Sequence, residues 1–295
     1  MVDLKPWDDT PESAVQMVDM DDVQYFRDYP KYMSATKLKV FAKDPLDYVN
    51  KYIDGNLKKP APGAMLVGSA AHCYILEGRK AYRSRYNVTD GPTNSKTGSP
   101  YGKATKAYAA WLDEQPEGKD IISKAEHETI VKMGLSVEAE RDATALLTHG
   151  NAEQALRGKL EGVDCQSKID WLNLHGVRPS IVDLKTTVSM ERFKRHQFWD
   201  LGYDVQVGFY SLMVQALTGQ LPTFDFVVVE SGGPNPATYG GYHPAKVYHI
   251  GCIGEPDTSV TLEQCMGKAT DQLRSYRHAA ETETWHGKYR GSETL

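Results

Sequence analysis

The feature that most constrains the fold is a turn-forming stretch, residues 173–179, flanked on both sides by short segments rich in Ile, Val and Leu. The stretch contains Asn, His, Gly and Pro, so it and its flanks predict a β-hairpin. A turn centred near Gly176 places Asp170 roughly opposite Asp183. Because side chains alternate along a strand, Lys185 shares a face with Asp183. The sequence therefore predicts that two carboxylates and an ammonium group converge.

This group of side chains has a specific chemical use. Carboxylates are the hard oxygen ligands that suit Mg²⁺ or Mn²⁺, and a nearby lysine can orient a water or stabilise developing negative charge. Two-metal cleavage of phosphodiesters requires such a set. A solvated strand face is the alternative interpretation. Asp183 lies in the apolar run 180–184, and a buried carboxylate is costly unless it is paired or bound to a metal.

Composition excludes several classes of protein. The chain is 40% hydrophobic and 25% charged, and no run of 18 apolar residues exists, so we expect no membrane span. The N-terminus lacks the basic and apolar regions of a signal peptide. The cysteines are scattered without a Cys-x-x-Cys pair, which argues against a zinc ribbon or an iron–sulfur cluster and favours a reducing, cytosolic setting. They are Cys73, Cys165, Cys252 and Cys265.

The net charge of −5 is unevenly distributed along the chain. Residues 1–22 hold seven acids and one base, so the remaining body, 23–295, carries +1. Local basic clusters on a near-neutral body can still attract a polyanion. We therefore expect an acidic N-terminal arm at 1–28, disordered or loosely docked, that occupies the groove of the protein in place of a polyanion such as DNA. A single domain at 29–284 and a frayed C-terminal tail at 285–295 complete the predicted organisation.

The order of predicted elements indicates an α/β fold, with a mixed central β-sheet flanked by helices and an N-terminal helical elaboration. One helix begins at its N-cap Ser34 and ends at Asp44-Pro45, and another ends at the capping residue Gly78. The predicted helices span 34–44, 65–77, 103–114, 123–148, 202–218 and 259–281, and the predicted strands span 153–158, 163–172, 180–186, 224–229 and 246–250.

Three of these helices carry polar residues that suggest a site. His72 lies in a mostly apolar helix. It is either a buried core residue with its hydrogen bonds made, or a side chain that faces the predicted metal site. Ser34 begins a lysine-rich helix whose N-terminus can hold a phosphate, although a capped surface helix has the same pattern. Gln206 and Tyr210 are four residues apart and share one helix face.

Together these motifs resemble the PD-(D/E)XK nuclease superfamily, and within it the RecE-like phage exonucleases related to the lambda-type recombination exonuclease. The resemblance covers about 29–250. Asp170 followed by Asp183-Leu184-Lys185 corresponds to the superfamily pattern, with Ile169 in place of the proline of its name. The segments 33–38 and 68–77 and the pair Gln206 and Tyr210 look like three further motifs of these exonucleases.

The resemblance implies roles for individual residues. Asp170, Asp183 and the backbone carbonyl of Leu184 would hold the divalent ions, and Lys185 would activate or orient the attacking water. His72 would lie at or beside a metal. A further metal ligand, Glu153, looks like an additional upstream acid of the family.

The remaining implied roles concern DNA. Gln206 and Tyr210 would support the site or contact the DNA strand, and Ser34 would lie near the 5′ end of that strand. Lys31, Lys37 and Lys39 are the basic candidates beside Ser34, and we take Lys37 as the DNA-binding one.

The resemblance also implies an activity and partners. We expect an exodeoxyribonuclease that uses Mg²⁺ or Mn²⁺, two ions per site, and degrades one strand of double-stranded DNA from its ends in the 5′→3′ direction. Such enzymes form rings, here a trimer or tetramer, and work beside a single-strand annealing protein in the cytoplasm of a bacterial host. The alternatives are a single-strand or structure-specific nuclease, like those of CRISPR adaptation or helicase–nuclease complexes, and an inactive DNA-binding subunit.

Overall fold

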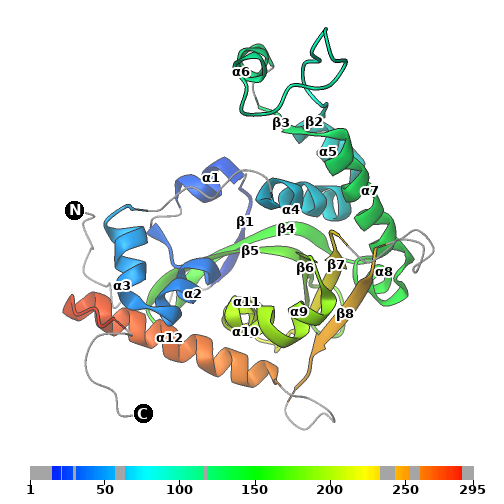
Figure 1. Cartoon of the computed structure of the whole chain (residues 1–295). Helices are drawn as coiled ribbons and strands as arrows, with labels where there is room; N and C mark the ends of the chain where they lie inside the picture. The colour runs from blue at the N-terminus through cyan, green and yellow to red at the C-terminus, as the bar shows by residue number, and fades with distance from the viewer. Residues whose placement is uncertain are drawn as a thin grey trace.

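The centre of the molecule is a six-stranded sheet with the strand order β1-β4-β5-β6-β7-β8 (Figure 1). The computed structural model describes residues 15–20, 22–28, 31–56, 64–115, 118–232, 243–252 and 260–287. The strands of this sheet are β1 (Gln16–Val18), β4 (Asn151–Leu160), β5 (Val163–Asn173), β6 (Ser180–Thr187), β7 (Thr223–Glu230) and β8 (Ala245–Ile250). All neighbouring pairs are antiparallel except β6 and β7, which are parallel. The predicted mixed sheet is therefore confirmed.

Helices cover both faces of the sheet (Figure 1). The helices are α1 (Asp22–Arg27), α2 (Ala35–Lys43), α3 (Pro45–Tyr48), α4 (Ala64–His72), α5 (Gly78–Arg85), α6 (Lys106–Asp113), α7 (Lys124–Ala139), α8 (Arg141–Leu146), α9 (Met190–Arg192), α10 (Phe198–Asp200), α11 (Tyr203–Thr218) and α12 (Leu262–Thr282). Side chains of α2, α11 and α12 share one buried apolar cluster, and those of α4 and α7 share another on the opposite face. The described residues include no helix that could span a membrane.

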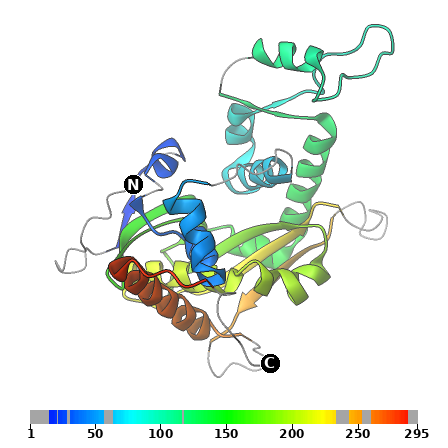
Figure 2. The same cartoon turned by 60° about the vertical axis from the view of Figure 1, so that its left-hand side comes forward.

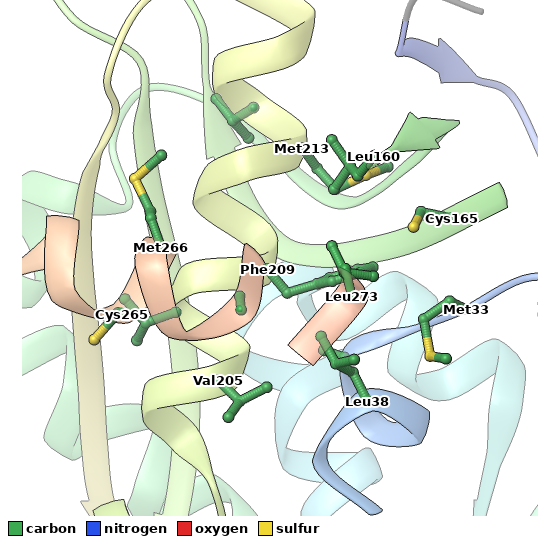
Figure 3. Close-up of a cluster of buried hydrophobic side chains, with 14 of the residues drawn as sticks. Met33, Leu38, Leu160, Cys165, Val205, Phe209, Met213, Cys265, Met266 and Leu273 are labelled. Atoms are coloured by element: carbon green, nitrogen blue, oxygen red, sulfur yellow. The ribbon is translucent and has the colours of Figure 1, made fainter. Parts of the chain in front are cut away.

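The first cluster joins three helices to the sheet through fully buried side chains such as Leu38, Phe209 and Leu273 (Figure 3). Close contact between α11 and α12 depends on Gly208. A Cβ atom at this position would lie 2.0 Å from the backbone oxygen of Cys265, so only glycine permits this approach. The tight packing fixes α11, which carries two of the predicted site residues.

The second cluster places α4 directly on the sheet. Ala70 and Ala71 are completely buried, and a Cβ atom at Gly68 would lie 3.6 Å from Thr186 Oγ1 on β6. These small residues bring the helix close to the strand that carries Asp183. The helix ends at His72, where a π-helical turn, Cys73–Glu77, follows. Such turns inside helices often occur at functional sites.

Residues 78–123, which we call the arm, project away from the rest of the protein (Figures 1 and 2). The arm contains α5, α6 and a small parallel sheet of β2 (Tyr86–Val88) and β3 (Asp120–Ile122). At its tip the Tyr108 ring lies over Gly91, whose φ of +78° and lack of a side chain make room for it. The Gly-, Ser-, Thr- and Pro-rich residues 88–103 are therefore part of a folded extension.

The boundaries differ from the prediction in several places. The predicted cap at Gly78 is confirmed, because Gly78 has a φ of +86° and caps the turn 73–77, but a further helix, α5, follows directly and continues to Arg85. The single helix predicted at 123–148 is two helices, α7 and α8, which meet at Glu140.

The predicted termini also differ in part. Gln16–Val18, within the acidic N-terminal segment predicted at 1–28, pair with β4 as an edge strand. Trp285 is not frayed, because its ring stacks on Tyr48 with the centroids 5.9 Å apart. Residues 1–14 of the predicted acidic N-terminal segment and residues 288–295 of the predicted C-terminal tail lie outside the described part of the chain.

Candidate active site

Three carboxylates lie in one row across neighbouring strands β4, β5 and β6. The register pairs Ala152 with Trp171 and Gln154 with Ile169, which places Glu153 opposite Asp170. The hairpin register pairs Trp171 with Val182, so Asp170 in turn lies opposite Asp183. The predicted opposition of Asp170 and Asp183 is therefore confirmed, and Glu153 extends the row.

Both β4 and β5 change face at this row. Ile169 and Leu172 join the same apolar cluster although their odd separation would place them on opposite faces of a regular strand. On β4, Leu156 joins the first cluster and Ala152 contacts the second, although an even separation would keep them together. Glu153 has a φ of +56°, a strained value for a non-glycine residue. The distortion places the acids at the boundary between the two cores.

His72 reaches this boundary from the end of α4. Its Nδ1 atom lies 3.4 Å from Asp170 Oδ2, which also accepts a 2.9 Å hydrogen bond from the backbone N–H of Leu184. Ligand atoms of His72, Glu153 and Asp170 all lie within 4.8 Å of one another. Among the described residues this is the one such group of three metal-ligating side chains, so the polar residue in the apolar helix faces the acids.

The chemistry of this group fits a divalent cation. Burial, with the Lys185 charge nearby, lowers the pKa of His72, so its imidazole is neutral and able to bind a metal. Burial and the Asp183 charge raise the pKa of Asp170, and burial and the Asp170 charge raise that of Glu153. Crowded carboxylates of this kind gain stability from a bound cation, and imidazole with carboxylates suits Mg²⁺, Mn²⁺ or a similar ion.

Asp183, by contrast, is held by protein groups. Its side chain is 1% exposed, Oδ2 contacts the Lys185 ammonium group, and Oδ1 accepts a 2.7 Å hydrogen bond from Gln206 Nε2. Burial lowers the pKa of Lys185, but the neighbouring Asp183 and Asp170 carboxylates outweigh it and raise the pKa overall. Lys185 is therefore a fixed cation between the two acids, as the hairpin prediction requires.

Two residues that the prediction did not assign to the site complete this network. Lys39 Nζ donates a 3.1 Å hydrogen bond to Gln206 Oε1. The Tyr203 ring lies 5.3 Å from Lys39 Nζ and 5.0 Å from Lys185 Nζ, measured to the ring centroid. Both ammonium groups therefore lie near one aromatic ring, which stabilises two close positive charges.

A cleft of about 870 Å³ opens beside the acids. Its lining includes Ser34, His72, Glu153, Asp170 and Tyr210. Five of the predicted site residues, from segments far apart in the sequence, thus border one hollow that is large enough for part of a polymer.

The predicted DNA-binding lysine has a different position. Lys37 is buried, its Nζ atom donates a 2.8 Å hydrogen bond to the Tyr32 carbonyl, and burial lowers its pKa to about 8. It is not among the described residues that line the cleft. Ser34 does line the cleft, and its hydroxyl accepts a hydrogen bond from the backbone N–H of Lys37, as an N-cap does. The lysine of α2 that reaches the site is Lys39.

Glu153 has a cationic neighbour of its own. Its carboxylate lies 2.7 Å from Lys168 Nζ, on the adjacent strand. The row therefore alternates in charge, with Lys168 beside Glu153 and Lys185 beside Asp183. A metal between Glu153 and Asp170 would compete with Lys168 for the Glu153 carboxylate.

Comparison with known proteins agrees with this geometry. Residues 34–238 match the family described as a PDDEXK-like domain of unknown function (DUF3799). The chain belongs to this family. The match includes α2, α4, the three acidic strands and α11, and membership of the PD-(D/E)XK nuclease superfamily is therefore confirmed. No curated protein matches the sequence.

A solved structure shares the fold of this PDDEXK-like domain. A crystal structure of a protein from Eubacterium rectale, provisionally named an exonuclease, has a TM-score of 0.58 and 16% sequence identity, and the match covers 94% of this chain and 96% of that one. The structure of SSO0001 has a TM-score of 0.33 and 12% identity over 82% of this chain and 75% of that one, too low a score to indicate a shared fold. The first similarity supports the nuclease fold alone.

Proposed function

We propose that this protein is a divalent-metal-dependent deoxyribonuclease that hydrolyses phosphodiester bonds. The observation that carries the proposal is the meeting of Asp170, Asp183 and Lys185 with His72 and Glu153 beside an open cleft. This set combines metal ligands with a fixed cation next to them. Phosphodiester hydrolysis needs both, because negative charge develops on the phosphate as water attacks.

The residues of the chain have separable tasks. Asp170, His72 and Glu153 would hold the ion, which when bound supplies Lewis-acid stabilisation of the phosphate oxygens. Asp183 fixes the Lys185 ammonium group, and Gln206 fixes Asp183.

Lys185 would donate a hydrogen bond to the attacking water or to a phosphate oxygen. Because its pKa is raised, it stays protonated at neutral pH and acts as an electrostatic group. Asp183 is already occupied by Lys185 and Gln206, so it would share in metal binding only if the Lys185 contact loosened.

We further propose that the substrate is the end of double-stranded DNA, degraded 5′→3′ as one strand in phage-type recombination. Support comes from the motif order that resembles RecE-like exonucleases and from the provisional exonuclease name of the Eubacterium rectale structure. A ring-shaped oligomer, a trimer or tetramer, and a single-strand annealing protein in a bacterial cytoplasm belong to the same proposal. The proposal also includes two ions per active site, either Mg²⁺ or Mn²⁺.

Digestion of linear and circular duplex DNA, labelled at one end at a time, tests both levels of the proposal. In Mg²⁺ we expect loss of linear DNA starting from the 5′ ends, with covalently closed circles intact. Cleavage of circles would replace the exonuclease with an endonuclease, and release of label first from 3′ ends would reverse the polarity. If neither substrate is cut, and single-stranded or branched DNA is also untouched, the nuclease proposal is wrong. The Asp183→Asn protein serves as the inactive control.

A further inference from the structure

The arm, residues 78–123, has a charge balance opposite to that of the whole chain. It contains eight Lys and Arg residues and five Asp and Glu residues, whereas the chain has a net charge of −5. Its first helix, α5, has the sequence GRKAYRSR, with four basic residues and no acid. Positive charge is therefore in excess in this extension of an acidic protein.

Most of these charges are not used to hold the fold together. Arg79, Lys80 and Arg83 of α5 are exposed, and none of them forms an ion pair within the described part of the chain. Lys119 Nζ donates a 2.9 Å hydrogen bond to the backbone oxygen of Arg83, which brings a fourth cation against the helix. We call these four residues the basic strip. Arg85 is excluded, because it forms a bidentate pair with Glu77 at 2.5 and 2.6 Å.

The basic strip begins where the cleft ends. The cleft that holds His72, Glu153 and Asp170 is also lined by residues of the arm's base, namely Arg85, Tyr86, Gly118 and Asp120. Arg85 is the last residue of α5, and Gly118 and Asp120 flank Lys119 of the strip. A polymer leaving the cleft on this side would therefore pass beside α5, the helix that carries three of the four residues of the strip.

The backbone of the arm is held by hydrogen bonds between its two strands. The two segments that link the arm to the rest of the protein pair with each other as β2 and β3. Next to this pair, the backbone N–H of Thr89 donates a 2.8 Å hydrogen bond to the backbone oxygen of Ile122. Toward the tip, the exposed side chains of Lys96 and Lys106 have no ion-pair partner among the described residues. Lysines carried on a folded backbone have a defined spacing, so they bind a regular polyanion at a smaller entropic cost than lysines on an unstructured segment.

The surface of the arm is suited to a polyanion and not to a second protein. Leu112 is its one exposed large hydrophobic side chain among the residues described. Stable protein interfaces have an apolar centre, whereas contacts to a DNA backbone come chiefly from Lys and Arg. Charge complementarity therefore favours nucleic acid over another copy of this chain.

We propose that the basic strip and the tip lysines, Lys96 and Lys106, bind the phosphate backbone of the uncut part of the DNA substrate, outside the cleft. The proposal rests on the proposed nuclease function and adds a second contact region to it. The arm would contribute affinity for long DNA and no chemistry. Removing its charges should therefore affect long substrates and spare short ones.

Equilibrium binding without divalent metal, in EDTA, tests this separation with the full chain. The probes are a duplex of about ten base pairs, roughly one helical turn, and a duplex several turns long. For Lys80→Ala/Arg83→Ala we expect about tenfold weaker binding of the long duplex and a salt slope smaller by roughly 2, since each phosphate contact contributes about 0.9. The short duplex should bind as in the parent protein.

Lys132→Ala/Lys246→Ala is the matched control. Both lysines are exposed, neither forms an ion pair within the described residues, and neither lines the cleft. This variant should bind both duplexes like the parent. Lys96→Ala/Lys106→Ala provides an independent variant at the tip. It replaces the α5 variant if circular dichroism shows that the α5 substitutions unfold the helix.

Other results would overturn the proposal. If the arm variants bind the long duplex with unchanged affinity and salt slope, the arm does not bind DNA. An equal loss of affinity for both duplexes would place the strip inside the cleft. A change in sedimentation without a change in affinity would identify a second copy of the chain as the partner. If the parent and control proteins bind DNA but do not cut it in Mg²⁺, the nuclease proposal fails while the arm proposal stands.

Discussion

The side-chain amide of Gln206 lies between Asp183 and Lys39 and bonds to both. Its Nε2 atom donates to Asp183 Oδ1 at 2.7 Å, and its Oε1 atom accepts from Lys39 Nζ at 3.1 Å. A donor on one side and an acceptor on the other set the orientation of the amide. Gln206 thus positions a buried carboxylate through a hydrogen bond.

Replacing Gln206 should slow catalysis without removing it. Partners of this kind around metal sites typically contribute 10–100-fold, so we expect kcat of Gln206→Ala to fall by about tenfold with little change in KM. Gln206→Glu should be worse, because a carboxylate beside Asp183 cannot donate and repels it. Steady-state cleavage of a labelled duplex measures both variants. Gln220→Ala, an exposed glutamine after α11, is the control, and an effect on KM alone would contradict the positioning role.

The Asp183–Lys185 pair should affect stability as well as activity. Asp183→Ala leaves the Lys185 ammonium buried without its main partner, which we expect to lower the free energy of unfolding by about 3 kcal/mol. Asp183→Ala/Lys185→Met removes both charges and should recover most of this loss. Urea denaturation followed by circular dichroism provides the comparison.

The same variants separate stability from catalysis. Both the single and the double variant should lack cleavage activity, as should Asp183→Asn. If the double variant were as unstable as Asp183→Ala, the loss would come from a cavity and not from an unpaired charge. Parental activity in Asp183→Asn would remove this residue from the site.

Removing the metal should stop cleavage. EDTA should abolish the activity, and Mg²⁺ or Mn²⁺ in excess should restore it. His72→Ala and Glu153→Gln should each weaken Mn²⁺ binding at least about tenfold, since each removes one ligand of a group of three. Titration calorimetry without DNA measures this affinity. His278→Ala, an exposed histidine on α12, should bind Mn²⁺ like the parent, and unchanged affinity in the His72 variant would exclude the cluster as the metal site.

Trp285 should contribute to the stability of the first core. Its ring stacks on Tyr48 and makes edge contacts with Phe41, with the Trp285 and Phe41 centroids 6.3 Å apart. Because the side chain is half-buried, Trp285→Ala should cost about 2 kcal/mol and lower the melting temperature. His286→Ala, its exposed neighbour, should leave the melting temperature unchanged, and an equal effect of the two would indicate a frayed segment.

The sequence predicts those parts of the site that depend on regular periodicity. The turn near Gly176 and a period of two are sufficient to place Asp170 opposite Asp183 and to put Lys185 on the same face. The spacing of four residues likewise places Gln206 and Tyr210 on one face of α11, and the family resemblance implies that this face is turned toward the acids. The alternation of helical and extended segments was enough to predict a mixed sheet covered by helices.

Other parts depend on tertiary contacts that no periodicity encodes. Lys37 and Lys39 are two apart on α2 and point about 200° apart, so the sequence cannot say which of them faces the acids. Glu153 has a left-handed backbone that its residue type does not favour, and the change of face in β4 follows from it. Strands of three residues, such as β1, are too short to show alternation.

The whole row of acids and both of its lysines come from one continuous segment, 153–185. Three like charges meeting on adjacent strands would oppose their own pairing, but Lys168 and Lys185 lie in the same strands and offset that repulsion. We infer that this meander can form early in folding, before α4 or α11 docks on it. Replacing Lys168 and Lys185 with methionine should then slow refolding more than it speeds unfolding. A larger effect on the unfolding rate would show that the meander forms late in folding.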